Sequence, residues 1–231
     1  MMRLQNISAL FIKQVKDVIK NMPVLILFIV YPCIAAVMTQ AMQGQAGSNV
    51  FFIGIFATMH CVFTPIVAAS SILAEEKETN TLRVLIMSNV QLKEYFFSIG
   101  GFILLADILT GSTFLFIADY DAAIAVMFIF SLGIGCIIST VLGICIGLYA
   151  GNMAAATGLA VPFGMLFAFL PMLAYFNDKI ERISKFTYGQ QVSYLLSGSK
   201  FSLSGIIIIC INSAVFITLA AVLYRRSLSE D

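Results

Sequence analysis

Residues 122–149 read AAIAVMFIFSLGIGCIISTVLGICIGLY and contain no charged side chain. A helix rises 1.5 Å per residue, so about 20 apolar residues cross the roughly 30 Å hydrocarbon core of a bilayer. This stretch is therefore long enough and apolar enough to span a membrane as one helix.

Five further stretches of the same kind lie on either side of it. The six predicted spans are residues 23–42, 50–73, 95–118, 122–149, 153–176 and 205–224. The links between them are a neutral one (43–49), a charged one (74–94), two tight ones (119–121 and 150–152) and a long polar one (177–204). The sequence therefore predicts an all-α polytopic membrane protein, with a separate N-terminal segment (1–22) and a six-span domain (23–231).

The composition of the whole chain indicates the same class. Of its 231 residues 60% are apolar and 11% are charged, whereas an average globular chain has about 25% charged residues. One soluble core of this length could not bury so much apolar surface. The net charge of +1 excludes a nucleic-acid binder with a dense basic face. The five cysteines share no short spacing and there is one histidine, so neither a metal site nor a catalytic residue is predicted.

The distribution of Lys and Arg predicts the orientation of the spans, because these residues resist translocation. Nine of them lie at the two ends of the chain and in the link 74–94, and four lie in the link 177–204. We expect both termini and the link 74–94 to be cytoplasmic and the protein to be a multi-pass protein of the cell membrane.

The N-terminal segment has the pattern of an amphipathic helix. Its apolar residues recur every three or four positions: Leu4, Ile7, Phe11, Val15, Val18 and Met22. Such a helix lies in the membrane interface, with its apolar side in the lipid and its basic residues near anionic headgroups. The alternative is a basic flank that only sets the topology.

The most unusual stretch is the charged link 74–94, which reads AEEKETNTLRVLIMSNVQLKE. Helical spacing places Leu82, Leu85, Ile86 and Asn89 on one stripe, and Thr79 or Thr81 is a suitable N-cap. The interpretation is an apolar knob ringed by charges that docks in a groove of a soluble partner. The alternative is a solvated connector without a partner.

The residue order in this link resembles the coupling-helix signature of ABC-type-2 exporter permeases. The residues concerned are Glu76-Lys77-Glu78, Thr81-Leu82-Arg83 with Leu85, and Lys93-Glu94-Tyr95. The amphipathic N-terminal segment, the six spans, the segment 151–158 and the segment 187–198 are similar to parts of the same family. The chain departs from the family pattern at Asn80, where glycine is frequent, and at Asn89, where proline is frequent.

The resemblance implies a permease subunit of an ATP-driven exporter. It implies half of a pathway for a hydrophobic or amphipathic substrate (antibiotic, peptide or lipid), a second permease copy or a sister permease, and two copies of a cytoplasmic ATPase that binds ATP and Mg. The expected ATPase-docking residues are Glu75, Glu76, Lys77, Glu78, Thr79, Leu82, Arg83, Leu85 and Ile86. The chain has no Gly-Lys pair and hence no phosphate-binding loop of the Walker type. We therefore expect it to be no enzyme and to bind no cofactor itself.

Two features inside the predicted spans stand out. Asp107 is the one charge deep in a span, and an intramembrane carboxylate is expected to face the bundle interior or a wet cavity. We consider it a group of the substrate pathway or gate, or else a carboxyl group hydrogen-bonded to a neighbouring helix. His60 is interpreted as a packed polar residue.

A row of small residues and the last external link complete the predictions. Every fourth residue from 135 to 151 is small, which allows close helix approach in the same chain or across a dimer: Gly135, Ser139, Gly143, Gly147 and Gly151. In the link 177–204 we expect two short helices broken near Gly189, which either cap an external gate, as in the resembled family, or form a simple surface amphipath.

A function without transport is the alternative for the whole chain. A multi-pass membrane enzyme needs clustered His, Asp or Glu residues near one interface, and the sequence has no such cluster. A sensory or structural subunit is the other possibility, and the charged link argues against it only weakly.

Overall fold

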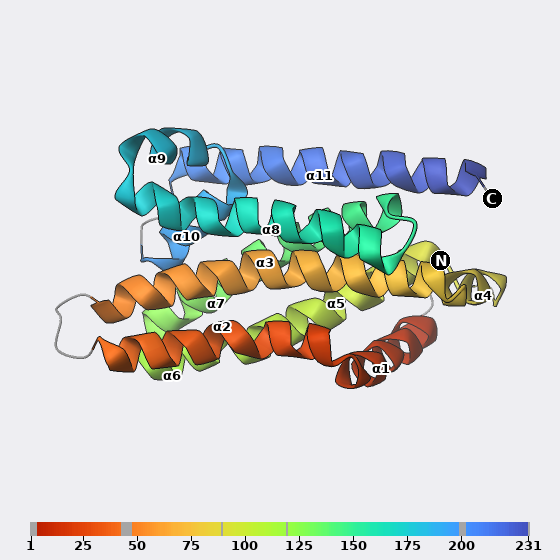
Figure 1. Cartoon of the computed structure of the whole chain (residues 1–231), viewed down its shortest axis with the longest axis horizontal. Coiled ribbons are helices and arrows are strands. Elements are labelled where there is room, and N and C mark those ends of the chain that lie inside the picture. The colour runs from red at the N-terminus through yellow and green to blue at the C-terminus, as the bar shows by residue number, and fades with distance from the viewer. Residues whose placement is uncertain (1–3, 43–47, 89, 119, 199–201, 231) are drawn as a thin grey trace.

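The computed structural model describes residues 4–42, 48–88, 90–118, 120–198 and 202–230 (Figure 1). These residues form helices and no strand. The helices are α1 (Leu4–Lys20), α2 (Met22–Ala41), α3 (Ser48–Glu78), α4 (Thr81–Met87), α5 (Leu92–Gly111), α6 (Thr113–Ala118), α7 (Ala122–Tyr149), α8 (Met153–Phe176), α9 (Asp178–Ser184), α10 (Tyr188–Leu196) and α11 (Leu203–Glu230).

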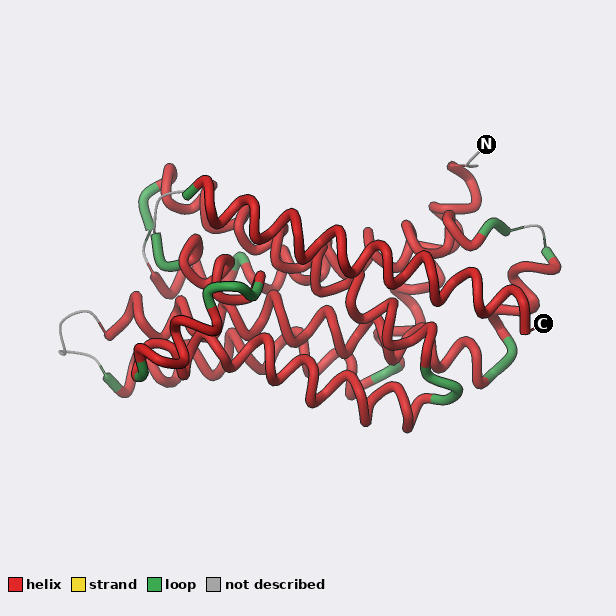
Figure 2. Tube along the Cα trace, turned by 90° about the horizontal axis from the view of Figure 1, so that it is seen from above, coloured by secondary structure: helices red, strands yellow, loops and turns green. Residues whose placement is uncertain are grey.

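Six helical stretches are long and apolar enough to cross a membrane, so the predicted all-α class and number of spans are confirmed. They are Met22–Ala41, Phe51–Glu78, Lys93–Ala118, Ala122–Tyr149, Met153–Phe176 and Leu203–Arg225. The long helices lie side by side in one elongated bundle, and α1 is tilted against them at one end (Figures 1 and 2). Of the first predicted link, residues 43–47 lie outside the described residues.

The third span is not the single helix that the sequence predicts, because it is divided into α5 and α6 at Ser112. The hydroxyl groups of Ser112 and Thr113 donate hydrogen bonds back to the carbonyl oxygens of Leu109 (2.7 Å) and Thr110 (2.6 Å). Such local bonds compete with the helical ladder and bend helices. The helix break thus has a local cause, the hydroxyl hydrogen bonds, which the hydropathy of the span does not predict.

The second span is longer than predicted. The helix α3 continues through residues 74–78, which the sequence assigned to a charged connector, and it ends at Glu78. The following Asn80 has a left-handed backbone with φ of 56°, which terminates the helix before α4 begins at Thr81. The connector is therefore largely helical, and only a few residues separate α3 from α4 and α4 from α5.

The helix α3 is the centre of the bundle. It packs against α2, α5, α7, α8 and α10, and its span is the most deeply buried of the six. The buried apolar residues form two large clusters, one in the half that contains α10 and one in the half that contains α1. The helix α11, by contrast, packs mainly along α7 and α10 and exposes most of its surface.

The two ends of the bundle carry different elements. At one end lie α4, α1 and the C-terminal end of α11, and at the other end lie α9 and α10 (Figure 1). We call these the α4 end and the α9 end. The arrangement agrees with an even number of spans and places the charged hairpin α3–α4 on the same side as both terminal segments.

The row of small residues on α7 packs against α3 of the same chain. A Cβ atom added to Gly143 would lie 2.6 Å from the carbonyl oxygen of Ile66, and one added to Gly147 would lie 2.9 Å from Cβ of Leu73. These contacts show that the row approaches α3 of the same chain. Gly151 lies beyond the end of α7 and a Cβ atom there would meet no atom within 4 Å, so it is outside the row.

The two short helices expected between the fifth and sixth spans are present as α9 and α10, but the break between them differs from the prediction. It falls at residues 185–187, and Gly189 lies within α10. A Cβ atom at Gly189 would approach the Phe167 carbonyl oxygen of α8 to 2.4 Å, so this glycine serves close packing. Gly189 therefore does not mark the helix break that the sequence predicts there, but lies inside a helix.

One hydrogen bond ties α9 to α10. The hydroxyl of Tyr194 on α10 donates to Oε1 of Glu181 on α9 at 2.7 Å. Burial, together with this bond and the charge of Glu181, raises the pKa of Tyr194 to about 12. The same bond and the nearby Lys185 lower the pKa of Glu181. This bond thus connects the two short helices to each other at the α9 end.

Candidate functional site

Four consecutive charged residues at the end of α3, Glu75 to Glu78, bond to four different parts of the chain. A helix turns by about 100° per residue, so neighbouring side chains leave α3 in different directions. We call these four residues the 75–78 cluster. Each was expected from the sequence to contact a separate ATPase, and the structure gives each of them a partner within the chain.

Glu76 points inward, toward α1. Its side chain is 8% exposed, and Oε1 accepts hydrogen bonds from Lys13 Nζ at 2.6 Å and from Gln14 Nε2 at 2.9 Å. Lys13 also contacts Asp17 at 3.0 Å. Burial lowers the pKa of Lys13, but the hydrogen bond and charge of Glu76, with a smaller effect of Asp17, outweigh it and leave this pKa raised. The two residues therefore connect α1 to α3 as a partly buried ion pair.

Lys77 binds the C-terminal end of α7. Its Nζ donates to the carbonyl oxygens of Gly147 (3.3 Å), Leu148 (2.9 Å) and Ala150 (2.6 Å). The last carbonyl groups of a helix have no partner in the helix and carry a partial negative charge. The ammonium group satisfies them, and α7 is thereby fixed to the end of α3.

The two outer glutamates of the cluster bind the starts of two other helices. Glu78 Oε2 accepts a hydrogen bond from the backbone N–H of Met153, the first residue of α8, at 2.9 Å. Glu75 Oε2 accepts one from Nδ2 of Asn21, which precedes α2, at 3.0 Å. A carboxylate is favourable at a helix N-terminus. The end of α3 is consequently bonded to α1, α7, α8 and the entry to α2.

The short helix α4 lies beyond this cluster and has two sides. Leu82 and Leu85 are half-buried and pack against the apolar cluster of the α4 end. Arg83 is exposed, and so are Val84 (59%) and Met87 (79%). The predicted stripe therefore faces the bundle at Leu82 and Leu85, and among the described side chains of α4 the exposed apolar ones are Val84 and Met87.

Two further predicted docking residues are Thr79, between α3 and α4, and Ile86 of α4. The hydroxyl of Thr79 donates to the carbonyl oxygen of Glu75 at 2.8 Å and contacts the Thr81 hydroxyl at 2.9 Å. Ile86 belongs to α4, but its side chain lies outside the described part of the structure, as does the whole of Asn89.

The backbone of Asn80 gives a first testable prediction. Asparagine tolerates the left-handed conformation found there, whereas a β-branched residue does not, at a cost of roughly 1–2 kcal/mol. We expect Asn80→Val to lower the free energy of unfolding by about this amount and Asn80→Gly to leave it unchanged, measured by thermal unfolding in detergent. Equal losses for both variants would contradict the assigned backbone conformation.

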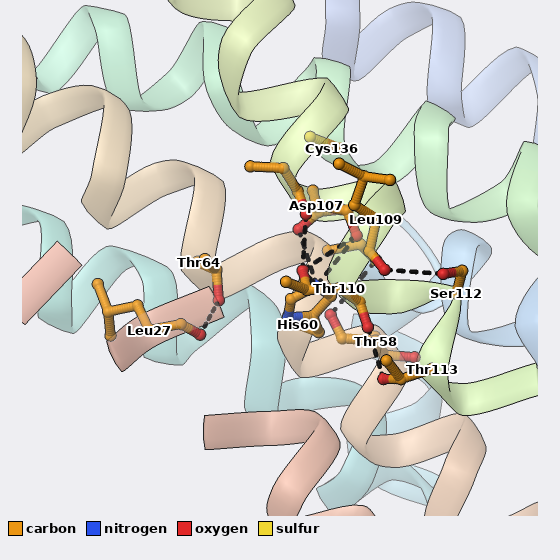
Figure 3. Close-up of polar contacts among 12 residues, drawn as sticks. Leu27, Thr58, His60, Thr64, Asp107, Leu109, Thr110, Ser112, Thr113 and Cys136 are labelled. Carbon is orange, nitrogen blue, oxygen red and sulfur yellow. Dashed lines mark hydrogen bonds and ion pairs between the residues drawn. The ribbon is translucent and has the colours of Figure 1, made fainter. Parts of the chain in front are cut away.

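A second polar constellation lies inside the bundle, where His60 of α3 meets Asp107 of α5 (Figure 3). Both side chains have no exposed surface. Nε2 of His60 is 3.3 Å from Oδ1 of Asp107, 3.2 Å from the Asp107 carbonyl oxygen and 3.1 Å from Oγ1 of Thr110. Because the Thr110 hydroxyl donates to the carbonyl oxygen of Ala106 at 2.7 Å, all three neighbours are acceptors, and we assign the ring hydrogen to Nε2.

This pair is surrounded by apolar and aromatic side chains. The rings of Phe28, Tyr31 and Phe114 approach the imidazole edge-on, with centroid distances of 6.5, 6.5 and 5.8 Å. Asp107 therefore does not line an open cavity in this conformation. The sequence indicated Asp107, but it missed His60 as its neighbour, since the two residues lie 47 positions apart and no local spacing connects them.

No group of three or more His, Cys, Asp or Glu residues among the described residues is placed to hold a metal ion. Comparison with known proteins gives no match to a family model or to a curated protein.

Proposed function

We propose that the chain is the permease subunit of an ATP-driven exporter, as the resemblance to ABC-type-2 permeases implies. The observation that carries the proposal is the hairpin at the α4 end. It presents two exposed apolar side chains, Val84 and Met87, next to a charged cluster that is bonded to four other parts of the bundle.

This arrangement suits the transmission of force from a partner to the spans. A load on α4 acts on the end of α3 across only two residues. The 75–78 cluster then passes it to α1 through Glu76, to α7 through Lys77 and to α8 through Glu78. A displacement of a few ångström at α4 thus acts on several helices together, as a rigid-body transition between two bundle states requires.

The energy source in this proposal is a separate chain. Two copies of a cytoplasmic ATPase hold ATP and Mg, and each docks on the α4 of one permease chain. A second copy of this chain, or a sister permease, supplies the other half of the pathway for a hydrophobic or amphipathic substrate. With the excess of Lys and Arg at the α4 end, both termini are cytoplasmic, and α1 lies in the inner interface of the cell membrane.

The structure determines which substitutions test the docking role. Reversing the charge of Glu76 and Glu78 would break bonds inside the bundle, so a loss of activity would not report on the partner. Val84 and Met87 are exposed and can be changed without disturbing described contacts. The double variant Val84→Glu, Met87→Glu introduces charge at the proposed interface, and a buried unpaired charge there is costly.

We expect this double variant to reduce at least about tenfold the vanadate-sensitive ATPase activity that copurifies with the tagged full-length chain, equivalent to about 1.4 kcal/mol of binding free energy. The matched control is Phe186→Glu, which changes a 73% exposed side chain between α9 and α10, at the α9 end. The control is expected to retain the activity. Undiminished activity with the double variant would refute docking at α4.

A further inference from the structure

We propose that His60 and Asp107 form a buried proton-binding site, which keeps one proton while α3 and α5 are packed together and releases it when they separate. This inference does not depend on the proposed transport function. It rests on the placement of the pair: two ionisable side chains without exposed surface, 3.3 Å apart, on the two helices whose contact they form (Figure 3).

The pair makes fewer hydrogen bonds than a buried imidazole and carboxylate usually do. Among the described residues, Nδ1 of His60 is buried without a hydrogen-bond partner, and the polar neighbours of the buried Asp107 carboxylate are Nε2 of His60 at 3.3 Å and the weakly donating thiol of Cys136. Buried polar atoms are normally satisfied, and an unsatisfied one in a native structure calls for an explanation. A proton held by the pair removes the charge that would otherwise remain on these atoms.

The packing around the pair leaves little room for a larger ligand. A Cβ atom added to Gly111, next to the imidazole, would lie 2.9 Å from Cδ1 of Leu132 and 3.4 Å from Cδ2 of His60. A methyl group at this point would have to displace the Leu132 side chain, and Phe28, Tyr31 and Phe114 enclose other sides of the ring. A proton, by contrast, is taken up by such a site without displacing any side chain.

The charge balance determines how many protons the pair holds. A neutral imidazole beside an ionised carboxylate leaves one negative charge, and burying an uncompensated charge is strongly unfavourable. One additional proton makes the pair neutral, either as imidazolium with carboxylate or as imidazole with carboxylic acid. A further proton would leave a buried positive charge. The packed bundle therefore favours the state with one bound proton.

Among the described residues, no neighbouring group supplies the missing positive charge. The titratable side chains that face the pair from the surrounding helices are Tyr31 of α2, Cys61 of α3 and Cys136 of α7, and α6 contributes Phe114. Phenol and thiol groups are neutral in their protonated forms, which ordinarily prevail up to about pH 8. Compensation of the Asp107 charge is thus left to His60 and the proton.

The functional consequence is a link between protonation and the contact of α3 with α5. Separation of these helices admits water, and in water at neutral pH the ordinary histidine and aspartate pKa values of about 6.5 and 3.9 leave the pair without the extra proton. Every opening at this contact therefore releases one proton, and every closing takes one up. A rise in pH favours the open arrangement.

Unfolding of the full-length chain in mixed micelles tests the proton count. Above pH 6.5 the unfolded chain binds one proton fewer at these residues than the folded wild type, so the unfolding constant of the wild type rises about tenfold per pH unit. In Asp107→Asn, folded His60 stays neutral, and its unfolding constant instead rises about tenfold per unit as the pH falls below 6.5.

The quantity to measure is the ratio of the unfolding constants of Asp107→Asn and wild type, in which contributions from other groups cancel. We expect this ratio to fall about a hundredfold between pH 5.5 and 7.5. The control Asp121→Asn changes an exposed residue before α7, and its ratio to wild type is expected to stay constant. A constant ratio for Asp107→Asn as well would show that the pair carries no extra proton.

A second measurement needs no variant, since His60 is the one histidine of the chain. In full-length protein labelled with ¹⁵N-histidine and ¹³C-aspartate in lipid nanodiscs, NMR at pH 7.5 reads both partners separately. A cationic ring, or a neutral ring together with one protonated aspartate carboxyl, supports the proposal. A neutral ring with every aspartate ionised overturns it, even if Asp107→Asn does not fold.

Discussion

Replacing Glu76 by lysine is expected to lower the free energy of unfolding of the bundle by about 4 kcal/mol. The wild-type Glu76 residue is 6% exposed, and its carboxylate accepts two hydrogen bonds from α1, one of them from the ammonium group of Lys13 at 2.6 Å. The substitution places a second ammonium group against the first in a site with little access to water. Chemical unfolding in mixed micelles measures the loss.

Two further variants separate the buried contact from a general effect of charge. Glu75→Lys changes the preceding, exposed residue and is expected to cost less than about 1 kcal/mol. The exchange Lys13→Glu with Glu76→Lys restores opposite charges across α1 and α3, and part of the stability is expected to return. Equal losses at positions 75 and 76 would contradict the ion pair of Glu76 with Lys13.

The second large effect is expected at Gly143, where alanine should lower the free energy of unfolding by about 3 kcal/mol. A methyl group there would lie 2.6 Å from the carbonyl oxygen of Ile66 and 2.8 Å from Cβ of Ala69. Both are backbone or backbone-proximal atoms of α3, which cannot rotate away. The helices α3 and α7 must move apart, and this weakens the most extensive helix contact of the bundle.

The control for this prediction is the same glycine-to-alanine substitution at an exposed helical site. Gly158 lies in α8, is exposed, and has no atom within 4 Å of an added Cβ. Alanine has a higher helix propensity than glycine by up to about 1 kcal/mol, so Gly158→Ala is expected to preserve or slightly raise stability. Thermal melts of both variants decide the matter, and a stable Gly143→Ala would show that α3 and α7 are less closely packed.

The sequence predicted the spans because a long apolar helix without charge is required by the bilayer and is visible in a local window. A different pattern, apolar residues spaced among polar ones in the link 177–204, predicted the two short helices that are present as α9 and α10. It failed where local bonds or distant contacts intervene: at Ser112, where hydroxyl groups interrupt the third span, and at Gly189, which lies within α10 because it packs against α8.

The polar contacts were the least predictable part. The sequence identified Glu75–Glu78 and Asp107 as unusual, but their described partners include Lys13 and Ala150 for the cluster and His60 for the aspartate. These partners are dozens of positions away and have no spacing pattern in common. A buried carboxylate must be compensated, yet only the packing of α1, α5 and α7 on α3 shows by which residue.

The length of α3 has a consequence for any protein that binds the hairpin. Its 31 residues give an axis of about 46 Å, which exceeds the roughly 30 Å hydrocarbon core by about 16 Å. Even with some tilt, about two to three turns of α3 extend past the acyl chains. An extension at the end that carries the 75–78 cluster moves α4 away from the acyl chains. A binding protein would therefore meet α4 at or beyond the headgroup layer and would not need to be lipophilic itself.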